Sequence, residues 1–182
     1  MKYFKRMIGK NVYLSPLSMD DIDIYAKWMN DNDIIKNLNN VDQLINLLAE
    51  KGYIEKALMS GKKIFSIVKL ASDKVIGICN LESIDYKNRR ATVGIFIGEK
   101  DEHCKGYGTE ALRLLLDFGF NYMNLHSIDL KVYEFNKKAI RCYEKVGFKE
   151  YGRRREDYIL NGKKYNTICM DILEDEFRKS VQ

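Results

Sequence analysis

The chain has 182 residues, of which 46% are hydrophobic and 31% are charged, a balance typical of one globular domain. This composition excludes an intrinsically disordered chain. No apolar run approaches the roughly 20 residues that cross a bilayer, and residues 1–6 are basic without the apolar stretch of a signal peptide. We therefore expect a single domain over residues 1–182 and no association with a membrane.

The charge is mildly positive, with 31 basic and 26 acidic residues giving a net charge of +5. Apart from short runs such as Arg153-Arg154-Arg155, the charges are interspersed, whereas a nucleic-acid-binding protein concentrates them on one face. We expect no nucleic-acid partner. The four cysteines form no CxxC pair and there are only two histidines, which argues against a metal site and against disulfides. These features predict a cytoplasmic protein.

Seven segments are predicted as β-strands. The second to fourth are joined by tight turns and indicate an antiparallel meander. Asn161-Gly162 separates the last two, and Asn-Gly is the strongest short signal for a hairpin. The predicted strands cover residues 11–14, 64–68, 75–84, 91–98, 128–133, 148–159 and 165–173.

Helices are predicted between these strands from apolar spacing and from capping residues. Ser18 is placed to cap the first helix, and Asn136 and Gly147 bound the last one. The predicted helices cover residues 19–30, two short segments of 41–60 that break near Gly52 and end at Gly61, residues 107–122, and the segment between Asn136 and Gly147. The order predicts an α+β fold, with a mostly antiparallel sheet of six to seven strands flanked by helices.

A glycine-containing segment joins the fourth strand to the helix over 107–122, and it reads H-C-K-G-Y-G-T-E-A from His103 to Ala111. Glycine lets the backbone approach a ligand closely, and the N–H groups at a helix N-terminus favour an anion such as a pyrophosphate. The segment lacks the Walker pattern, and it lacks the third glycine of a dinucleotide-binding fingerprint. A strand–turn–helix connection without a ligand is the alternative.

A second motif, N-x-x-A-I-x-x-Y-x-K-x-G-F, runs from Asn136 to Phe148. Asn136, Ala139, Ile140 and Tyr143 have the spacing of one helix face, so that a polar cap and a phenol point the same way. Alternatively, Tyr143 is a core tyrosine with its hydroxyl at the rim.

Together with the hairpin sequence from Asp157 to Tyr165, these two motifs resemble the GNAT superfamily of acetyl-CoA-dependent N-acetyltransferases. The resemblance covers about residues 12–170 and is greatest for the branch of ribosomal-protein N-terminal and spermidine N-acetyltransferases. It implies a GNAT-like twisted sheet, acetyl-CoA as co-substrate and no metal.

The resemblance also implies a role for each matching residue. The loop from Cys104 to Thr109 would hold the pyrophosphate through backbone N–H groups, with Lys105 adding charge. The fourth strand would pair with the pantetheine arm, which Asn136 would contact, and Tyr143 would protonate the leaving thiolate. The implied cofactor-binding residues are Ile95, Phe96, Ile97, His103, Cys104, Lys105, Gly106, Tyr107, Gly108, Thr109 and Asn136.

The loop departs from the family pattern at two positions. His103 stands where Gln or Arg is usual, and Cys104 stands where many relatives have glycine. A Cβ at Cys104 is harmless at negative φ but strained in the left-handed region. Cys104 also invites a hypothesis of covalent catalysis, but no His–Asp pair is evident to support it. Both histidines are expected to be structural or at the surface.

Transfer by direct attack of an amine on the thioester, through a tetrahedral intermediate, requires a base. An amine with a pKa of about 10.4 is neutral in only about one molecule in 10³ at pH 7. Spermidine acetyltransferases carry Glu at the position of Asn80, and Glu82 alternates onto the same strand face. We nominate Glu82 as the base, with a solvated strand glutamate as the alternative.

The predicted function is acetyl transfer from acetyl-CoA to a primary amine, which is a peptide N-terminus, a polyamine or another small amine such as an aminoglycoside. The family binds acceptors mainly through about residues 18–62. In this chain the region mixes carboxylates with lysines, and this mixture does not favour one class of acceptor over the others. The alternative is a catalytically silent acetyl-CoA-binding sensor or interaction module, suggested by Asn80 and Cys104. The C-terminal hairpin is compatible with a homodimer.

Overall fold

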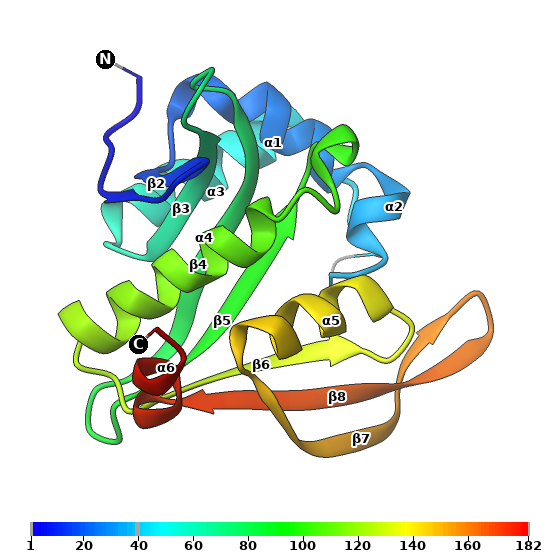
Figure 1. Ribbon diagram of the computed structural model, residues 1–182. Helices are drawn as coiled ribbons and strands as arrows, with labels where there is room; N and C mark the ends of the chain where they lie inside the picture. The colour runs from blue at the N-terminus through cyan, green and yellow to red at the C-terminus, as the bar shows by residue number, and fades with distance from the viewer. Residues whose placement is uncertain (1, 39–40, 182) are drawn as a thin grey trace. The chain divides into compact units, whose positions relative to one another are not determined.

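A computed structural model describes residues 2–38 and 41–181 (Figure 1). This part of the chain contains eight strands and six α-helices. The strands are β1 (Met7–Ile8), β2 (Val12–Pro16), β3 (Lys63–Lys69), β4 (Val75–Asp85), β5 (Arg90–Ile97), β6 (Ser127–Tyr133), β7 (Lys149–Leu160) and β8 (Lys163–Leu173). The helices are α1 (Ile22–Met29), α2 (Asn32–Ile35), α3 (Leu47–Met59), α4 (Tyr107–Asp117), α5 (Lys137–Val146) and α6 (Glu174–Val181).

The eight strands form one open sheet in the order β1-β2-β3-β4-β5-β6-β8-β7. Neighbouring strands run antiparallel in the pairs β1–β2, β2–β3, β3–β4, β6–β8 and β7–β8, and β5 runs parallel to β6. The predicted mixed, mostly antiparallel fold is confirmed, and the seven predicted strands are all present. The eighth is the two-residue β1, which is too short for a periodicity signal.

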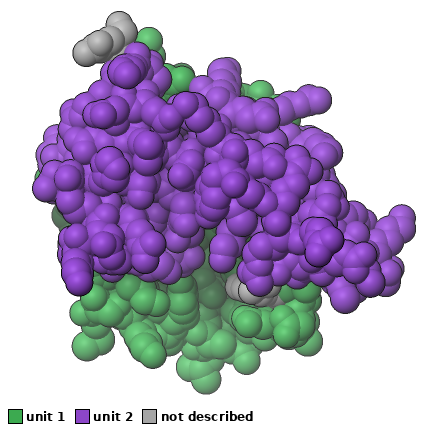
Figure 2. All heavy atoms as spheres, turned by 90° about the horizontal axis from the view of Figure 1, so that it is seen from below, with its two compact units in different colours: residues 1–81, 95–115 green, residues 82–94, 116–182 purple. Residues whose placement is uncertain are grey.

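The contacts divide the chain into two compact units, residues 1–81 with 95–115 and residues 82–94 with 116–182 (Figure 2). The chain passes from one unit to the other inside β4, inside β5 and inside α4. The single domain over 1–182 stays a prediction.

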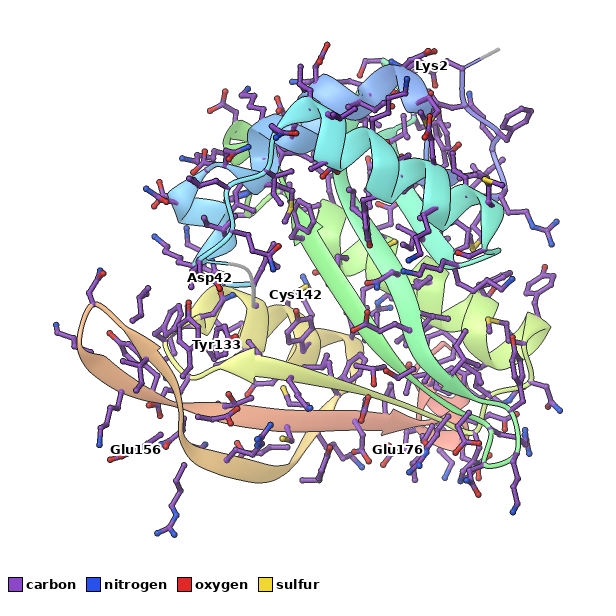
Figure 3. The ribbon with its side chains drawn as sticks, turned by 180° about the vertical axis from the view of Figure 1, so that it is seen from behind. Lys2, Asp42, Tyr133, Cys142, Glu156 and Glu176 are labelled. Carbon is purple, nitrogen blue, oxygen red and sulfur yellow. The ribbon has the colours of Figure 1, made fainter. Side chains whose placement is uncertain are left out.

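In the first unit, α1 and α3 lie on one face of the strands and α4 lies on the other (Figures 1 and 3). A buried cluster joins α1 and α3 to their face of the sheet, and burial of such apolar side chains is the main stabilising contribution. Its buried members are Tyr3, Tyr13, Leu17, Tyr25, Trp28, Ile34, Ile54, Val68 and Val75.

The helical prediction was right for the first helix and wrong in part for residues 41–60. As predicted, Ser18 caps the first helical segment, which opens with a 3₁₀ turn before α1, and accepts a hydrogen bond from the N–H of Asp20 at 3.2 Å. Residues 41–60 hold the single helix α3, which continues through Gly52 instead of breaking there. Glycine destabilises a helix interior by only about 1 kcal/mol. Burial of Ile54 and Ala57 offsets that, and so does the cap by Asn46.

In the second unit, alternate residues of β6 are buried, whereas β8 buries four consecutive residues, Thr167 to Met170. The predicted hairpin is confirmed. Asn161 (φ 50°) and Gly162 (φ 73°) form its two-residue turn, and positive φ at both positions is what a type I′ turn requires. The pairing of β7 with β8 shifts between Arg154 and Tyr158, where Glu156 (labelled in Figure 3) also has a positive φ.

Candidate active site

The end of β5 is fixed by close backbone and aromatic packing. A Cβ at Gly98 would lie 2.1 Å from the indole of Trp28, so only glycine fits there. Phe96 meets the same indole edge-on, with ring centroids 6.0 Å apart. Ile95, Phe96 and Ile97 are only half-buried. Three consecutive apolar residues therefore keep accessible surface at the end of a rigid strand.

The segment after β5 reaches α4 through a short 3₁₀ turn over Lys100–Glu102. His103 Nε2 lies 2.8 Å from the carbonyl oxygen of Ile97. A carbonyl can only accept, so this nitrogen carries the proton and donates. The contact ties the loop back to the strand, in line with the structural role expected for this histidine.

The loop ends in the exposed N-terminus of α4. Gly106 has a φ of 87°, and a Cβ built on it would meet no atom within 4 Å. The first helical hydrogen bond runs from the N–H of Glu110 to the carbonyl of Gly106 at 3.0 Å. The N–H groups of Tyr107 and Gly108 precede that bond, so the helix itself offers them no carbonyl. Such an end attracts an anion.

Cys104 adopts a left-handed backbone conformation, with a φ of 60°. A residue with a Cβ is strained in this region, on the order of 1–2 kcal/mol. The side chain is exposed and the thiol is free. Of the two conformations left open for this position, the loop therefore adopts the strained, left-handed one, which glycine would fit without strain.

Lys105 does not stand alone beside the loop. Its Nζ donates to Glu102 Oε2 at 3.0 Å, while Glu102 Oε1 accepts from Lys69 Nζ at 2.9 Å. The predicted positive charge at Lys105 is therefore part of an ion cluster that also includes a residue of β3.

Glu110 is an anchor of α4 that the sequence reasoning did not identify as functional. Its Oε1 accepts the N–H groups of Asn11 at 2.8 Å and of Val12 at 3.3 Å, and its Oε2 accepts from Asn11 Nδ2 at 2.8 Å. Gly9 lies so close to this carboxylate that a Cβ would be 2.2 Å from Oε1. Burial opposes ionisation, but these hydrogen bonds hold the pKa of Glu110 below its ordinary value. The loop and the helix start are thereby fixed to the segment before β2.

In the second unit, α5 begins at the predicted cap. Asn136 Oδ1 accepts the N–H of Ala139 at 3.2 Å, and Gly147 ends the helix in the left-handed conformation, with a φ of 116°. Tyr143 is 8% exposed, and its ring meets Phe148 edge-on at 6.0 Å. Burial, and to a lesser extent the neighbouring Cys142 (labelled in Figure 3), raise the pKa of the Tyr143 phenol. Asn136 thus caps the same short helix that carries Tyr143.

Glu82 lies on β4 and is exposed, while Asn80 is half-buried. Ser83 directly follows with a φ of 50°, so the regular strand conformation is interrupted there. Its role as the base stays a prediction, as does the alternative of a solvated strand glutamate.

Over residues 2–38 and 41–181, the side chains of His, Cys, Asp and Glu form no group of three that could hold a metal ion. Within the same ranges, no helix combines the length and the apolar character needed to span a membrane. Two arginines of the basic run are paired: Arg153 with Glu150, and Arg154 with Asp157 at 3.0 Å. The absence of a nucleic-acid partner stays a prediction.

The chain matches the family model described as "Acetyltransferase (GNAT) domain" over residues 11–149. It is 27% identical over 175 residues to the uncharacterized N-acetyltransferase p20 of Bacillus licheniformis, covering 90% of this chain and 93% of that protein. It is 30% identical over 152 residues to the spermidine N(1)-acetyltransferase of Vibrio cholerae serotype O1, covering 79% of this chain and 87% of the relative.

Solved structures give the same likeness. The crystal structure of spermidine N-acetyltransferase from Vibrio cholerae in complex with CoA and spermine superposes with a TM-score of 0.84 at 25% identity. The superposition covers 92% of this chain and 98% of that structure.

Proposed function

The chain belongs to the acetyltransferase (GNAT) family, and from this premise we propose that it transfers an acetyl group from acetyl-CoA to a primary amine. As a member of that family it is an acetyl-CoA-dependent acyltransferase. The observation that carries the proposal is the start of α4, where Gly106 in open space precedes N–H groups that lie before the first helical hydrogen bond.

The residues of the first unit fit the co-substrate. Backbone N–H donors of Tyr107 and Gly108 suit a diphosphate, because they supply hydrogen bonds and partial positive charge without a bulky side chain. The half-buried Ile95–Ile97 segment suits the less polar pantetheine arm. Acetyl-CoA, when bound, supplies the activated thioester that the amine attacks directly.

Tyr143 is proposed as the group that protonates the leaving thiolate. Its raised pKa keeps the phenol protonated at any working pH, so that a donor is always present. The cap uses the side-chain oxygen of Asn136, which leaves its amide nitrogen as the donor toward the cofactor arm.

The amine must lose a proton before it attacks, and Glu82 is proposed to accept it directly or through water. Its exposure on β4 supports exchange with solvent. The developing oxyanion needs a donor, for which a backbone N–H group of β5 is proposed.

The acceptor is proposed to be a small primary amine, with polyamines first. The named spermidine N-acetyltransferases among the relatives support this order. A peptide N-terminus is the second class. The proposal places the reaction in the cytoplasm and includes a homodimer; both rest on the sequence.

A catalytically silent acetyl-CoA-binding module is the second candidate. Two observations favour it: Asn80 cannot serve as a base, and Cys104 strains the phosphate loop. It predicts binding of acetyl-CoA without transfer to any amine.

The experiment that separates the two candidates is incubation with acetyl-CoA and a pooled amine panel, followed by mass spectrometry. The panel holds polyamines, aminoglycosides, amino acids and peptides with N-terminal Ala, Ser or Met. We expect one acetylated product, which also names the acceptor class. Acetyl-CoA binding with no product across the panel would favour the silent module.

A further inference from the structure

Two lysines beside the start of α4 share one carboxylate. Glu102 is only 9% exposed, and its two oxygens accept from Lys69 at 2.9 Å and from Lys105 at 3.0 Å. Lys69 comes from the end of β3, 33 positions away in the sequence, whereas Lys105 belongs to the loop itself. The three side chains together carry one positive charge in excess.

This Lys69–Glu102–Lys105 cluster adjoins the helix end. The Nζ of Lys69 lies 5.4 Å from the ring centroid of Tyr107, the first residue of α4. The hydrogen bond to Glu102 raises the pKa of Lys69, and the bonds from both lysines lower the pKa of Glu102. All three groups are therefore charged at neutral pH. The dipole of α4 adds further positive potential at the same place.

Coenzyme A presents two chemically different phosphate groups to such a surface. Its diphosphate is a diester, for which backbone N–H donors suffice. Its 3′-phosphate is a monoester with about two negative charges at neutral pH, and full cations bind it best through charge-assisted hydrogen bonds. The loop offers both kinds of donor: N–H groups at Tyr107 and Gly108, and ammonium groups at Lys69 and Lys105.

We propose that Lys69 and Lys105, held side by side by Glu102, bind the 3′-phosphomonoester of coenzyme A and make the protein prefer CoA to 3′-dephospho-CoA. The inference rests on the proposed use of acetyl-CoA and assigns the specificity of that site to two side chains. Glu102 is a positioning residue in this arrangement, since it orients both ammonium groups without touching the ligand.

A different role for the cluster is to fasten the loop to β3 with no part in recognition. The two roles differ in what they do to the two ligands. If the cluster only fastens the loop, its loss weakens the binding of both ligands equally, because both need the ordered loop. If the lysines contact the 3′-phosphate, their loss weakens the binding only of CoA, which carries that group.

The test is isothermal titration of CoA and of 3′-dephospho-CoA into the full chain and into Lys69→Met and Lys105→Met. We expect the wild type to prefer CoA, and each substitution to weaken CoA binding about tenfold, as one charged hydrogen bond is lost. Binding of 3′-dephospho-CoA should change less than twofold. Lys100→Met is the matched control, because Lys100 lies in the same segment but pairs with Asp31 and Asp33 at 2.8 and 2.9 Å.

Equal affinity of the wild type for CoA and 3′-dephospho-CoA overturns the inference and leaves the proposed function standing. Equal weakening of both ligands in the variants overturns it as well and assigns the cluster to fastening. A wild type that binds neither ligand overturns the inference and the proposed function together. If Lys69→Met does not fold, Lys69→Arg and the more exposed Lys105→Met still decide: Lys69→Arg must retain the preference for CoA, and Lys105→Met must lose it.

Discussion

The N-termini of α4 and α5 are built in opposite ways, although a strand and a short loop lead into each. Asn136 caps α5 and binds the N–H of Ala139. Gly106 precedes α4 and has no side chain with which to cap it. A capped end has already used one of its donors inside the protein, whereas an end that begins at glycine keeps its donors for a ligand.

The two helices accordingly offer different chemistry. α4 presents backbone donors and, through Glu110, is fastened at its first turn to the segment before β2. α5 presents a side chain, Tyr143, from a helix whose own polar ends are satisfied at Asn136 and Gly147. The proposed anion binding is thus assigned to the start of α4, and the proposed proton donation to Tyr143 near the end of α5. Substitutions in the two helices should therefore have separable effects.

The largest effect is expected at the side chain that α5 presents. Tyr143→Phe keeps the ring packed against Phe148 and removes only the hydroxyl. Turnover should fall on the order of 100-fold, as is typical for loss of a general acid, while the Kd for acetyl-CoA changes less than twofold. Steady-state kinetics and calorimetry on the same preparation measure both. Unchanged turnover would falsify the acid role.

The next largest effect is expected at the glycine end of α4. Gly106→Asp places a carboxylate where the loop is to receive phosphates, and it should weaken acetyl-CoA binding about tenfold or more. Gly106→Asn is the matched control, because Asn has the same shape without the charge and also tolerates positive φ. A Cβ at this position would meet no atom within 4 Å, and the strain of the positive φ is common to both variants. Equal loss in the two variants would mean that bulk, and not charge, matters there.

Glu110→Gln tests how firmly the glycine end of α4 is held. The carboxylate has a pKa below its ordinary value of 4.5, so its stabilisation is complete above that pH and is lost as the pH falls through the folded value. At pH 7 the variant should lose about 1–2 kcal/mol, because an amide oxygen replaces two charged acceptors. As the pH falls from 4.5 to the lower folded value, its midpoint of thermal unfolding should also vary less with pH than that of the wild type. Parallel pH profiles would contradict the anchoring role.

The sequence predicted the two helix starts unequally well, for a physical reason. The Asn136 cap, the Gly147 end and the Asn161-Gly162 turn depend on neighbouring residues, and each is confirmed. The anchor at Glu110 joins residues 99 positions apart, and no local pattern announces such a contact. The same limit hid Lys69, which reaches the loop from β3.

The error at residues 41–60 has the same origin. Gly52 is a valid local signal for a helix break, but the burial of Ile54 and Ala57 is a tertiary effect that the local signal does not include. At Cys104 the sequence left the sign of φ open, and the folded loop shows that φ is positive. Local sequence patterns therefore predicted the motifs, whereas contacts between distant residues determine how those motifs are positioned in the fold.

At the capped end, Asn136→Ala should lower stability by about 1 kcal/mol through loss of the hydrogen bond to Ala139. In a chain of this length that shifts the midpoint of thermal unfolding by about 2–4 °C. Asn136→Asp retains the acceptor, and its charge suits the helix dipole, so its stability should match the wild type. Neither Asp nor Ala can donate, so a few-fold loss of acetyl-CoA affinity in Asn136→Asp, whose cap is intact, would report the amide contact. An Asn136→Ala variant as stable as the wild type would contradict the stabilising role of the cap.

The smallest expected effect is a gain in stability, at Cys104 in the loop that precedes α4. Cys104 is the one residue between His103 and Gly106 that is left-handed without being glycine. Cys104→Asn should raise stability by about 0.5–1 kcal/mol, because Asn adopts this conformation more readily, whereas Cys104→Ala keeps the strain and should be neutral. Thermal unfolding of the two variants measures the difference. Because the thiol takes no part in the proposed transfer, both variants should keep their turnover, and a loss common to both would revive covalent catalysis at Cys104. A gain in acetyl-CoA affinity in Cys104→Asn would further show that the strain at this position opposes binding, and that the proposed phosphate loop binds better once the strain is relieved.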